Sequence, residues 1–284
     1  MNVLITGTSS GFGMLTARTL LTAGHDVAAT MRDVTGRNAT AASELQEFAA
    51  GQPGNLTILE MDVTDEASVN AACADAGRID VLVNNAGIGA GGLAEAFTPD
   101  QYARIFDINV LGVQRTMRAV LPGMRERRNG LVINISSVMG RIIIPFSGPY
   151  TTSKWALEGL TENYRVELMG TGIDVVSLEP GGFPTGISGR MVAPGDEDRT
   201  VSYGDHANLV EKVWGPFMEI LGGPEAPDPQ AVADEVIRIM GLPAGGRPVR
   251  TVVDPLTGGE GPEQINAVGD AVQNELLKMF GMMD

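Results

Sequence analysis

The stretch that decides the fold is Asn2-Val-Leu-Ile-Thr-Gly-Thr-Ser-Ser-Gly-Phe-Gly13. Its apolar residues 3–5 predict a buried strand, and the apolar residues spaced along 11–23 predict a helix that follows at once. The glycines between them permit a tight turn whose backbone N–H groups can approach a pyrophosphate. The spacing Gly-xxx-Gly-x-Gly differs from the commoner Gly-x-Gly-xx-Gly, so a glycine-rich turn without a ligand stays open from this stretch alone.

The same alternation continues along the chain and predicts a parallel sheet. Further apolar strands are expected at 27–31, 56–61, 79–83, 131–135, 173–178 and 249–253. Helices are expected at 40–50, 65–76, 98–127 with a break near Gly112, 149–169 and 229–241. Because short apolar strands alternate with helices, we expect an α/β fold: a single Rossmann-type doubly wound parallel sheet of about seven strands, with helices on both faces.

We expect residues 1–284 to form one dinucleotide-binding domain, because no linker-like stretch occurs before about residue 183. The rhythm breaks at 183–228, where Gly, Pro and acidic residues precede an apolar helix predicted at 207–221. An insertion of that length is usually functional, and we interpret it as a substrate lid. A Gly- and Pro-rich stretch from Pro255 opens a C-terminal extension over 255–284, with a last helix predicted at 262–280.

Composition and charge exclude several classes of function. The chain has 20 basic and 35 acidic residues, a net charge of −15, and so offers no basic footprint for nucleic acid. One cysteine and two scattered histidines predict neither a disulfide framework nor a metal site. No apolar run approaches the ~18 residues of a membrane span, and the chain starts on a strand rather than a secretory leader. We therefore expect a cytoplasmic protein without a membrane partner.

The end of the second predicted strand indicates which dinucleotide binds. An acidic residue there suits the ribose 2′-hydroxyl of NAD, whereas an arginine suits the 2′-phosphate of NADP. Here Met31 is followed by Arg32 and Asp33. A guanidinium can pair bidentately with phosphate, so we favour NADP(H) over NAD(H). Asp33 leaves an alternative open, because it could pair with Arg32 or take the ribose itself.

Tyr150-Thr-Thr-Ser-Lys154 opens the helix predicted at 149–169. Residues four apart share a helix face, so the phenol and the ammonium can meet, and a nearby cation lowers a tyrosine pKa toward neutrality. From this spacing alone, a tyrosine and a lysine paired on the protein surface are the competing interpretation. Polar groups at the ends of other predicted strands favour a site: Val83-Asn-Asn-Ala-Gly87, Asn134-Ile-Ser-Ser137 and Pro180-Gly-Gly-Phe-Pro-Thr185. Open α/β sheets bind ligands at this edge.

Taken together, these motifs resemble the classical short-chain dehydrogenase/reductase family over roughly residues 1–185, and weakly its hydroxysteroid and retinol dehydrogenase branch. The resemblance implies that Ser137 is the catalytic serine, Tyr150 the acid-base, Lys154 its partner and a ribose ligand, and Asn109 the anchor of a water relay. It implies that Asp62 contacts the adenine and Thr185 the nicotinamide carboxamide. The full set of expected cofactor contacts is Gly7, Ser9, Ser10, Gly11, Phe12, Gly13, Arg32, Asp62, Val63, Asn85, Ala86, Gly87, Tyr150, Lys154, Pro180, Gly181 and Thr185.

The expected function is an NADP-dependent oxidoreductase that interconverts a carbonyl and an alcohol by hydride transfer. Isoleucines at 142–144 and Phe146 beside Ser137, with Met191, Tyr203, Trp214 and Phe217 of the insertion, predict an apolar small-molecule substrate. An isomerase, epimerase or dehydratase with tightly held NAD(P), and a non-catalytic dinucleotide-binding protein, are the alternatives. Family members commonly pair through the helices corresponding to 98–127 and 149–169, so we expect a homodimer or homotetramer.

Overall fold

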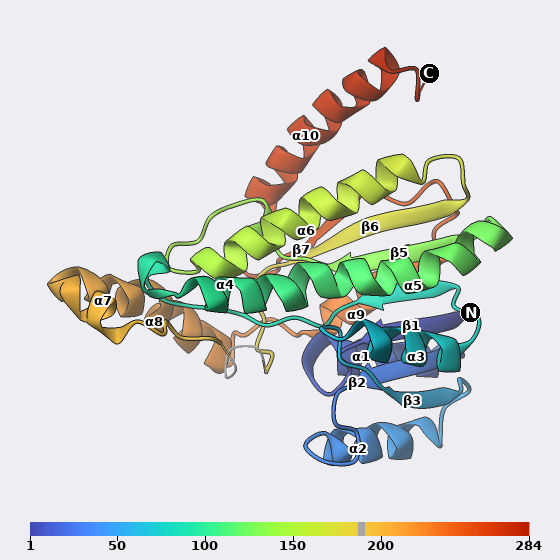
Figure 1. Ribbon diagram of the computed structural model, residues 1–284, viewed down its shortest axis with the longest axis horizontal. Helices are drawn as coiled ribbons and strands as arrows, with labels where there is room; N and C mark the ends of the chain where they lie inside the picture. The colour runs from blue at the N-terminus through green and yellow to red at the C-terminus, as the bar shows by residue number, and fades with distance from the viewer. Residues whose placement is uncertain (187–190, 284) are drawn as a thin grey trace.

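A computed structural model describes residues 1–186 and 191–283 of the chain and contains one seven-stranded parallel sheet (Figure 1). The strand order is β3-β2-β1-β4-β5-β6-β7. The strands are β1 (Asn2–Thr6), β2 (Asp26–Met31), β3 (Leu56–Glu60), β4 (Val81–Asn84), β5 (Gly130–Ile135), β6 (Ile173–Pro180) and β7 (Arg250–Val253). The predicted α/β class, strand number and parallel direction are confirmed, and all seven strands lie where the apolar runs placed them, with ends that differ by a residue or two.

Helices cover both faces of the sheet, because successive residues of a strand point to opposite sides. Ile5 of β1 packs in one core with α1 (Gly11–Thr22), α2 (Ala39–Ala49) and α9 (Gln230–Gly241). Its neighbour Leu4 packs in the other core with α3 (Glu66–Ala76), α5 (Gly112–Arg127) and α6 (Gly148–Glu167). Both residues are fully buried. Double coverage explains why the central strands are apolar at nearly every position.

The long helix predicted over 98–127 is broken where the sequence indicated. It consists of α4 (Pro99–Phe106), a π-helical turn η2 (Asp107–Leu111) and α5, so the break ends immediately before Gly112. Thr98 starts α4 with a capping box, in which its hydroxyl accepts from the Gln101 N–H at 3.2 Å. A π-helical turn displaces one side chain relative to the helical ladder, and here it contains Asn109.

The insertion contains more helix than the sequence predicted. Besides α8 (Leu209–Gly222), which corresponds to the predicted helix at 207–221, it forms α7 (Glu197–Ser202) and a 3₁₀ turn η5 (Gly204–Asn208). Figure 1 shows α7 and α8 grouped beyond one end of the sheet. Residues 187–190 of the predicted lid lie outside the described residues.

The C-terminal extension ends in α10 (Glu260–Met279), close to the predicted 262–280. Figure 1 shows that α10 extends away from the sheet and its covering helices. Over residues 1–186 and 191–283, no helix is both long and apolar enough to span a bilayer.

Candidate active site

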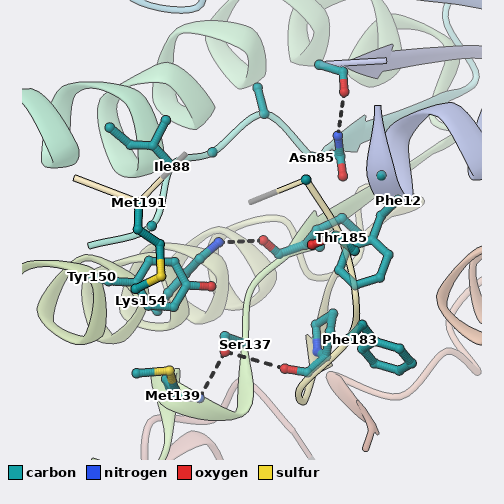
Figure 2. A pocket seen from close by; sticks show the side chains of 18 of the residues that line it. Phe12, Asn85, Ile88, Ser137, Met139, Tyr150, Lys154, Phe183, Thr185 and Met191 are labelled. Carbon is teal, nitrogen blue, oxygen red and sulfur yellow. Dashed lines mark hydrogen bonds between the residues drawn. The ribbon is translucent and has the colours of Figure 1, made fainter. Parts of the chain in front are cut away.

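One cavity of about 590 Å³ lies at the carboxyl ends of the central strands (Figure 2). Of the predicted site residues, the following line it: Gly7, Ser9, Ser10, Gly11, Phe12, Arg32, Asp62, Val63, Asn85, Ala86, Gly87, Ser137, Tyr150, Lys154, Pro180, Gly181 and Thr185. Gly13 and Asn109 do not line it. The structure therefore brings together residues that are more than 170 positions apart in the sequence.

The glycine turn between β1 and α1 leaves room for a ligand where side chains would fill it. Gly7 and Gly11 have φ angles of +72° and +56°, a backbone region that favours glycine. A Cβ on Gly13 would lie 2.4 Å from the Gly7 carbonyl oxygen and 2.5 Å from Asn85 Nδ2. Gly13 thus shapes the turn from behind, and the first N–H groups of α1 remain available beside the cavity.

Asn85 fastens this turn to the end of β4. Its Nδ2 donates to the carbonyl oxygens of Thr6 at 2.8 Å and Gly7 at 2.9 Å, as Figure 2 shows in part. The Thr6 hydroxyl accepts from the main-chain N–H groups of Asn85 and Ala86, each at 2.9 Å. The two strand ends are therefore held in fixed geometry, as a preorganised binding site requires.

At the far end of the cavity, Arg32 pairs with Asp62 and not with Asp33. The Arg32 Nη1 to Asp62 Oδ2 distance is 3.8 Å. Asp33 has a φ of +50°, and its carboxylate accepts from the Arg37 N–H at 2.9 Å. The Asp33 contact with Arg32 that the sequence left open is therefore not formed. Burial raises the pKa of Asp62, but its hydrogen bonds from Thr64 and the charge of Arg32 lower it more, so the group is anionic.

Arg37 also lines this end of the cavity, together with Asn38, and sequence reasoning missed both. They follow β2 by several residues, in a turn that folds back because Asp33 adopts a left-handed conformation and caps it. An Asp-xxx-Arg spacing after the second strand is the signal that could have indicated a second cation. Two arginines, Arg32 and Arg37, therefore line the cavity near the end of β2.

Ser137, Tyr150 and Lys154 form one wall of the cavity. Ser137 follows β5 and begins the 3₁₀ turn η3 (Val138–Gly140); its hydroxyl accepts from the Met139 N–H at 3.1 Å. Tyr150 and Lys154 lie in the first two turns of α6. The Lys154 Nζ donates to the Ile135 carbonyl at 2.8 Å and lies 5.6 Å from the centre of the Tyr150 ring. Figure 2 shows these side chains at the same cavity.

Burial governs the acid-base properties of this wall. Burial raises the pKa of Tyr150 to about 12, although the Ser137 hydroxyl opposes the shift. Burial lowers the pKa of Lys154 to about 8, opposed by the charge of Glu158. Burial dominates here, and the ammonium donates to Ile135 instead of the phenol; the expected lowering of the tyrosine pKa, which also counted the charge of a bound nicotinamide, stays a prediction. Tyr150 is therefore held neutral, the form that can give a proton to a carbonyl oxygen.

Asn109 lies behind the cavity wall. Its Oδ1 accepts from the Ile88 N–H at 2.9 Å, and its Nδ2 donates to the Ile88 carbonyl and to Ser153 Oγ, each at 3.0 Å. The Ser153 hydroxyl donates to the Tyr150 carbonyl at 2.7 Å. Asn109 thus joins the segment after β4 to the start of α6. Its predicted contact with a bound water stays a prediction.

The rest of the cavity wall is mainly apolar and comes partly from the insertion. The Trp214 Nε1 donates to the Pro145 carbonyl at 3.0 Å, which attaches α8 to the segment after β5. The apolar residues here are Met139, Ile142, Ile144, Met191, Trp214, Phe217, Met218, Leu221 and Leu256. Three expectations were wrong, because Ile143, Phe146 and Tyr203 do not line the cavity. Ile143 is 76% exposed, and Tyr203 donates to Glu95 Oε2 at 2.6 Å outside the cavity.

Two buried carboxyl groups lie behind Lys154. Glu158, one turn further along α6, accepts from Ser177 Oγ at 2.5 Å, and Glu179 accepts from Asn266 Nδ2 of α10 at 2.7 Å. Burial raises the pKa of both, that of Glu179 to about 8. Glu179 is therefore mostly neutral at pH 7. Among the described residues, no group of three or more His, Cys, Asp and Glu side chains is arranged to hold a metal ion.

Comparison with known proteins identifies the family. The model of the short chain dehydrogenase family matches residues 1–194. The chain belongs to this family. Retinol dehydrogenase 8 of Bos taurus is 36% identical to this short-chain dehydrogenase, over 84% of the chain and 77% of the relative. The 17-beta-hydroxysteroid dehydrogenase type 1 of Homo sapiens is 41% identical, over 70% of this chain and 62% of the relative. The 3-ketodihydrosphingosine reductase of Bacteroides thetaiotaomicron is 36% identical, over 74% and 76%.

Solved structures agree with this assignment. A short-chain dehydrogenase from Streptomyces avermitilis superposes on this structure with a TM-score of 0.73 and 30% sequence identity. The match covers 98% of this chain and 96% of the Streptomyces chain. An actinorhodin polyketide ketoreductase with NADPH matches 92% and 97%, with a TM-score of 0.72 and 28% identity. The resemblance stated from the motifs is thus confirmed, including its hydroxysteroid and retinol branch. The protein is an NAD(P)-dependent oxidoreductase.

Proposed function

We propose that this short-chain dehydrogenase interconverts a carbonyl and an alcohol on an apolar small molecule with NADP(H). The observation that carries the proposal is the continuity of one cavity. The glycine turn, the Ser137–Tyr150–Lys154 wall and the apolar side chains around Trp214 all line the same space of about 590 Å³. A dinucleotide and a substrate can therefore meet there, and such concave sites are the usual place for ligands.

The residues present fit a nicotinamide dinucleotide. A Cβ at Gly7 would approach the Ala86 Cα to 2.9 Å, and the cradle formed with Gly13 is kept clear of side chains. We assign the pyrophosphate to this turn and to Ser9 and Ser10, and the nicotinamide to Thr185 and the Pro180–Gly181 pair. Such a cofactor supplies or accepts a hydride at the substrate carbon.

NADP(H) is preferred in this proposal because two arginines line the cavity near the end of β2. Arg32 and Arg37 both line the cavity there, and a charge-assisted bond to phosphate is roughly twice as strong as a neutral one. The acidic candidates are engaged elsewhere: Asp33 accepts from the Arg37 N–H, and Asp62 accepts from Thr64. The ketoreductase described with NADPH agrees with this choice.

The chain's own groups then act on the substrate. Ser137 and Tyr150 hydrogen-bond the carbonyl oxygen, and Tyr150, held neutral by its raised pKa, gives its proton as negative charge develops on that oxygen. Lys154 stabilises the phenolate that remains. Because the pKa of Lys154 is about 8, it carries its proton at neutral pH. We assign the return of a proton to Tyr150 to a relay that includes Lys154 and a water near Asn109.

The apolar wall selects the substrate in this proposal. The 183–228 insertion acts as a lid within one domain, with Trp214 and Phe217 in edge-to-face contact at a ring distance of 5.5 Å. Relatives named for retinol and for a 17-beta-hydroxysteroid point to largely apolar molecules. We further propose self-association through α5 and α6, beside which Leu111 and Trp155 are 48% and 45% exposed.

The test combines cofactor and substrate panels. Oxidation of NADPH and NADH is followed at 340 nm with apolar cyclic ketones, retinoid aldehydes and small sugars, and reduction of NADP⁺ and NAD⁺ is followed with apolar alcohols and polyols. We expect faster turnover with NADPH and with apolar carbonyls. A preference for polyols or sugars would contradict the substrate assignment. Conversion of a substrate with retained cofactor and no net absorbance change would instead indicate an isomerase, epimerase or dehydratase.

A further inference from the structure

A cluster of buried charged and polar side chains lies behind the Lys154 wall, and the proposed reaction uses none of them. Glu158 of α6, Glu179 of β6 and Arg250 of β7 form its centre, and Asn266 reaches it from α10. The side chains of Arg250 and Glu158 are only 4% and 2% exposed. Burying an ion is costly unless opposite charges and hydrogen bonds surround it, so the charges here must balance within the cluster.

The two arginines of the cluster have acidic partners other than Glu158. Arg250 forms ion pairs with Asp270 through Nη1 and with Glu162 through Nη2. Arg141, which follows η3, also pairs with Glu162, at 3.2 Å. The Arg250 Nε and the Glu158 Oε2 lie 3.7 Å apart, and neither atom makes a hydrogen bond within the described residues. Two guanidinium groups are thus balanced mainly by two other carboxylates, which leaves the charge of Glu158 available to a further cation.

Glu158, and not Glu179, carries the negative charge of the two central acids. Ser177 and Glu179 are two residues apart on β6 and point to the same side of the strand, and the Ser177 hydroxyl donates to Glu158 Oε1 at 2.5 Å. The two carboxyl groups are therefore neighbours, and neighbouring buried acids do not ionise together. Glu179 accepts only from the neutral Asn266 amide, and the charge of Glu158 helps burial to raise the pKa of Glu179 to about 8.

Lys154 is the cation that Glu158 can balance. Its Nζ donates to the neutral carbonyl of Ile135, the contact drawn in Figure 2, and it forms no direct ion pair within residues 1–186 and 191–283. Glu158 follows Lys154 by one turn on the same face of α6. Burial lowers the pKa of Lys154 to about 8, and the charge of Glu158 opposes that lowering. An ammonium buried at the cavity thus depends on a carboxylate that does not touch it.

We infer that Glu158 is a positioning residue for the reduction, whose buried charge holds the Lys154 ammonium in its protonated form at the cavity. The inference rests on the proposed function, in which Lys154 stabilises the phenolate of Tyr150. For charges ~6–10 Å apart at an effective dielectric constant of ~20, loss of the Glu158 charge lowers the pKa of Lys154 by about one to two units. A large share of Lys154 would then be neutral at pH 7.

The first experiment measures the Lys154 ammonium directly and needs no substrate. The chain has three lysines, Lys154, Lys212 and Lys278, so lysine labelled with ¹³C at Cε gives an NMR spectrum with three signals. Loss of one signal in Lys154→Met assigns the signal of Lys154. Its chemical shift is then followed against pH in the protein without added cofactor. In Glu158→Gln the pKa of Lys154 is expected to fall by about one to two units.

Glutamine is the appropriate replacement because it keeps the size of the side chain. A Cβ on Gly140 of η3 would lie 2.9 Å from Glu158 Cγ, so this side chain packs closely against the turn that Ser137 begins. The amide oxygen of glutamine still accepts from Ser177, as the carboxylate does. A folded Glu158→Gln protein with an unchanged Lys154 pKa would overturn the inference.

Two controls separate the charge of Glu158 from the structure of the cluster. Glu167→Gln removes the same charge from an exposed position at the end of α6 and should leave the pKa of Lys154 unchanged. Glu179→Gln replaces a carboxyl group that is mostly neutral at pH 7, so it should change the pKa of Lys154 little. Equal lowering by Glu179→Gln and Glu158→Gln would show an effect of disturbed packing and would also overturn the inference.

The unsubstituted protein gives the same test if Glu158→Gln does not fold. Burial raises the pKa of Glu158 above its ordinary value of 4.5, so this group takes up its proton while the protein is being acidified above that pH. The Lys154 signal should then show a small second step, apart from its main step near pH 8. A folded protein in which Lys154 shows only the main step would contradict the inference.

The last experiment tests the consequence for the reaction. Single-turnover oxidation of NADPH with an apolar ketone is measured at pH 6 and pH 8. Glu158→Gln should be little changed at pH 6 and about 5- to 50-fold slower at pH 8, because a lysine with a lowered pKa is then mostly neutral. Equal slowing at both pH values would indicate a structural defect and overturn the inference. Failure of the unsubstituted protein to reduce any carbonyl would instead reject the proposed function, and the NMR titration would still decide whether Glu158 controls the charge of Lys154.

Discussion

Replacing Arg37 by alanine removes an arginine side chain from the end of the cavity where we propose that the adenosine 2′-phosphate binds. A hydrogen bond to a charged group contributes about 1.5–3 kcal/mol, which corresponds to a roughly 10- to 150-fold loss of affinity. Arg37 makes its described hydrogen bond to Asp33 through the main-chain N–H, which alanine retains. The turn should therefore survive, and the loss should fall on the ligand that carries a 2′-phosphate.

The assay is calorimetric titration of the protein with NADP⁺ and with NAD⁺, which requires no knowledge of the substrate. Arg37→Ala should weaken NADP⁺ binding by one to two orders of magnitude and change NAD⁺ binding less than threefold. Arg32→Ala should act in the same direction, because its exposed pair with Asp62 at 3.8 Å contributes only about 0–1 kcal/mol and is easily given up.

The matched control is Arg78→Ala, which removes an exposed arginine paired with Asp80 and outside the cavity lining. It should leave both titrations unchanged. Equal weakening of NADP⁺ and NAD⁺ by Arg37→Ala would refute the reasoning, because a contact to the shared parts of the two cofactors, and not to the 2′-phosphate, would then be responsible.

Three further outcomes follow from the site. The raised pKa of Glu179, about 8, means that the folded state binds its proton more tightly, so this group's stabilisation is complete below about pH 4.5 and lost as the pH rises through 8. The unfolding free energy of the original protein should fall between pH 5 and 8, and Glu179→Gln should reduce that fall by up to ~1.4 kcal/mol per pH unit. Denaturation at a series of pH values measures both. The same pH dependence in the two proteins would show that the pKa of Glu179 is not raised. Trp214→Ala removes part of the apolar wall and the bond to Pro145, so KM for apolar ketones should rise about tenfold while small polar carbonyls change little; equal effects on both would contradict the lid. Gly13→Ala places a Cβ 2.4 Å from a backbone oxygen. It should lower the free energy of unfolding by about 1–3 kcal/mol and weaken the binding of both NADP⁺ and NAD⁺. An unaltered thermal melt and unaltered titrations would contradict this prediction.

The fold was predictable because its signals are local. Each buried parallel strand is a short apolar run, and each is followed by helical periodicity, so the seven strands could be placed without knowledge of their neighbours. Helix α7 was not predictable in this way. It is short and polar, and it depends on the Asp196 cap and on the Arg199 ion pair with Glu95, which is 104 residues away in the sequence.

The candidate site was predictable where its residues follow strand ends. Ser137 follows the end of β5, and Tyr150 and Lys154 lie in the first turns of α6, the next helix, so all three lie at the same edge of the sheet. Arg37 was missed because its place at the cavity depends on the left-handed backbone conformation of Asp33. Residue types alone did not predict that conformation. The sequence could not indicate the opposing effect on the Tyr150 pKa for a related reason: burial and the Lys154 bond to Ile135 are properties of packing, which spacing along one helix does not contain.

The central claim is that Tyr150 gives a proton to a substrate oxygen in the cavity that also holds the dinucleotide. The most direct measurement compares the unsubstituted protein with Tyr150→Phe, using single-turnover NADPH oxidation with a saturating apolar ketone, alongside NADP⁺ titration and a thermal melt. The account predicts a fall in the reduction rate of about 10²–10⁴-fold, with the melt and NADP⁺ affinity little changed. A folded Tyr150→Phe protein that binds NADP⁺ and reduces the ketone at nearly the original rate would contradict it.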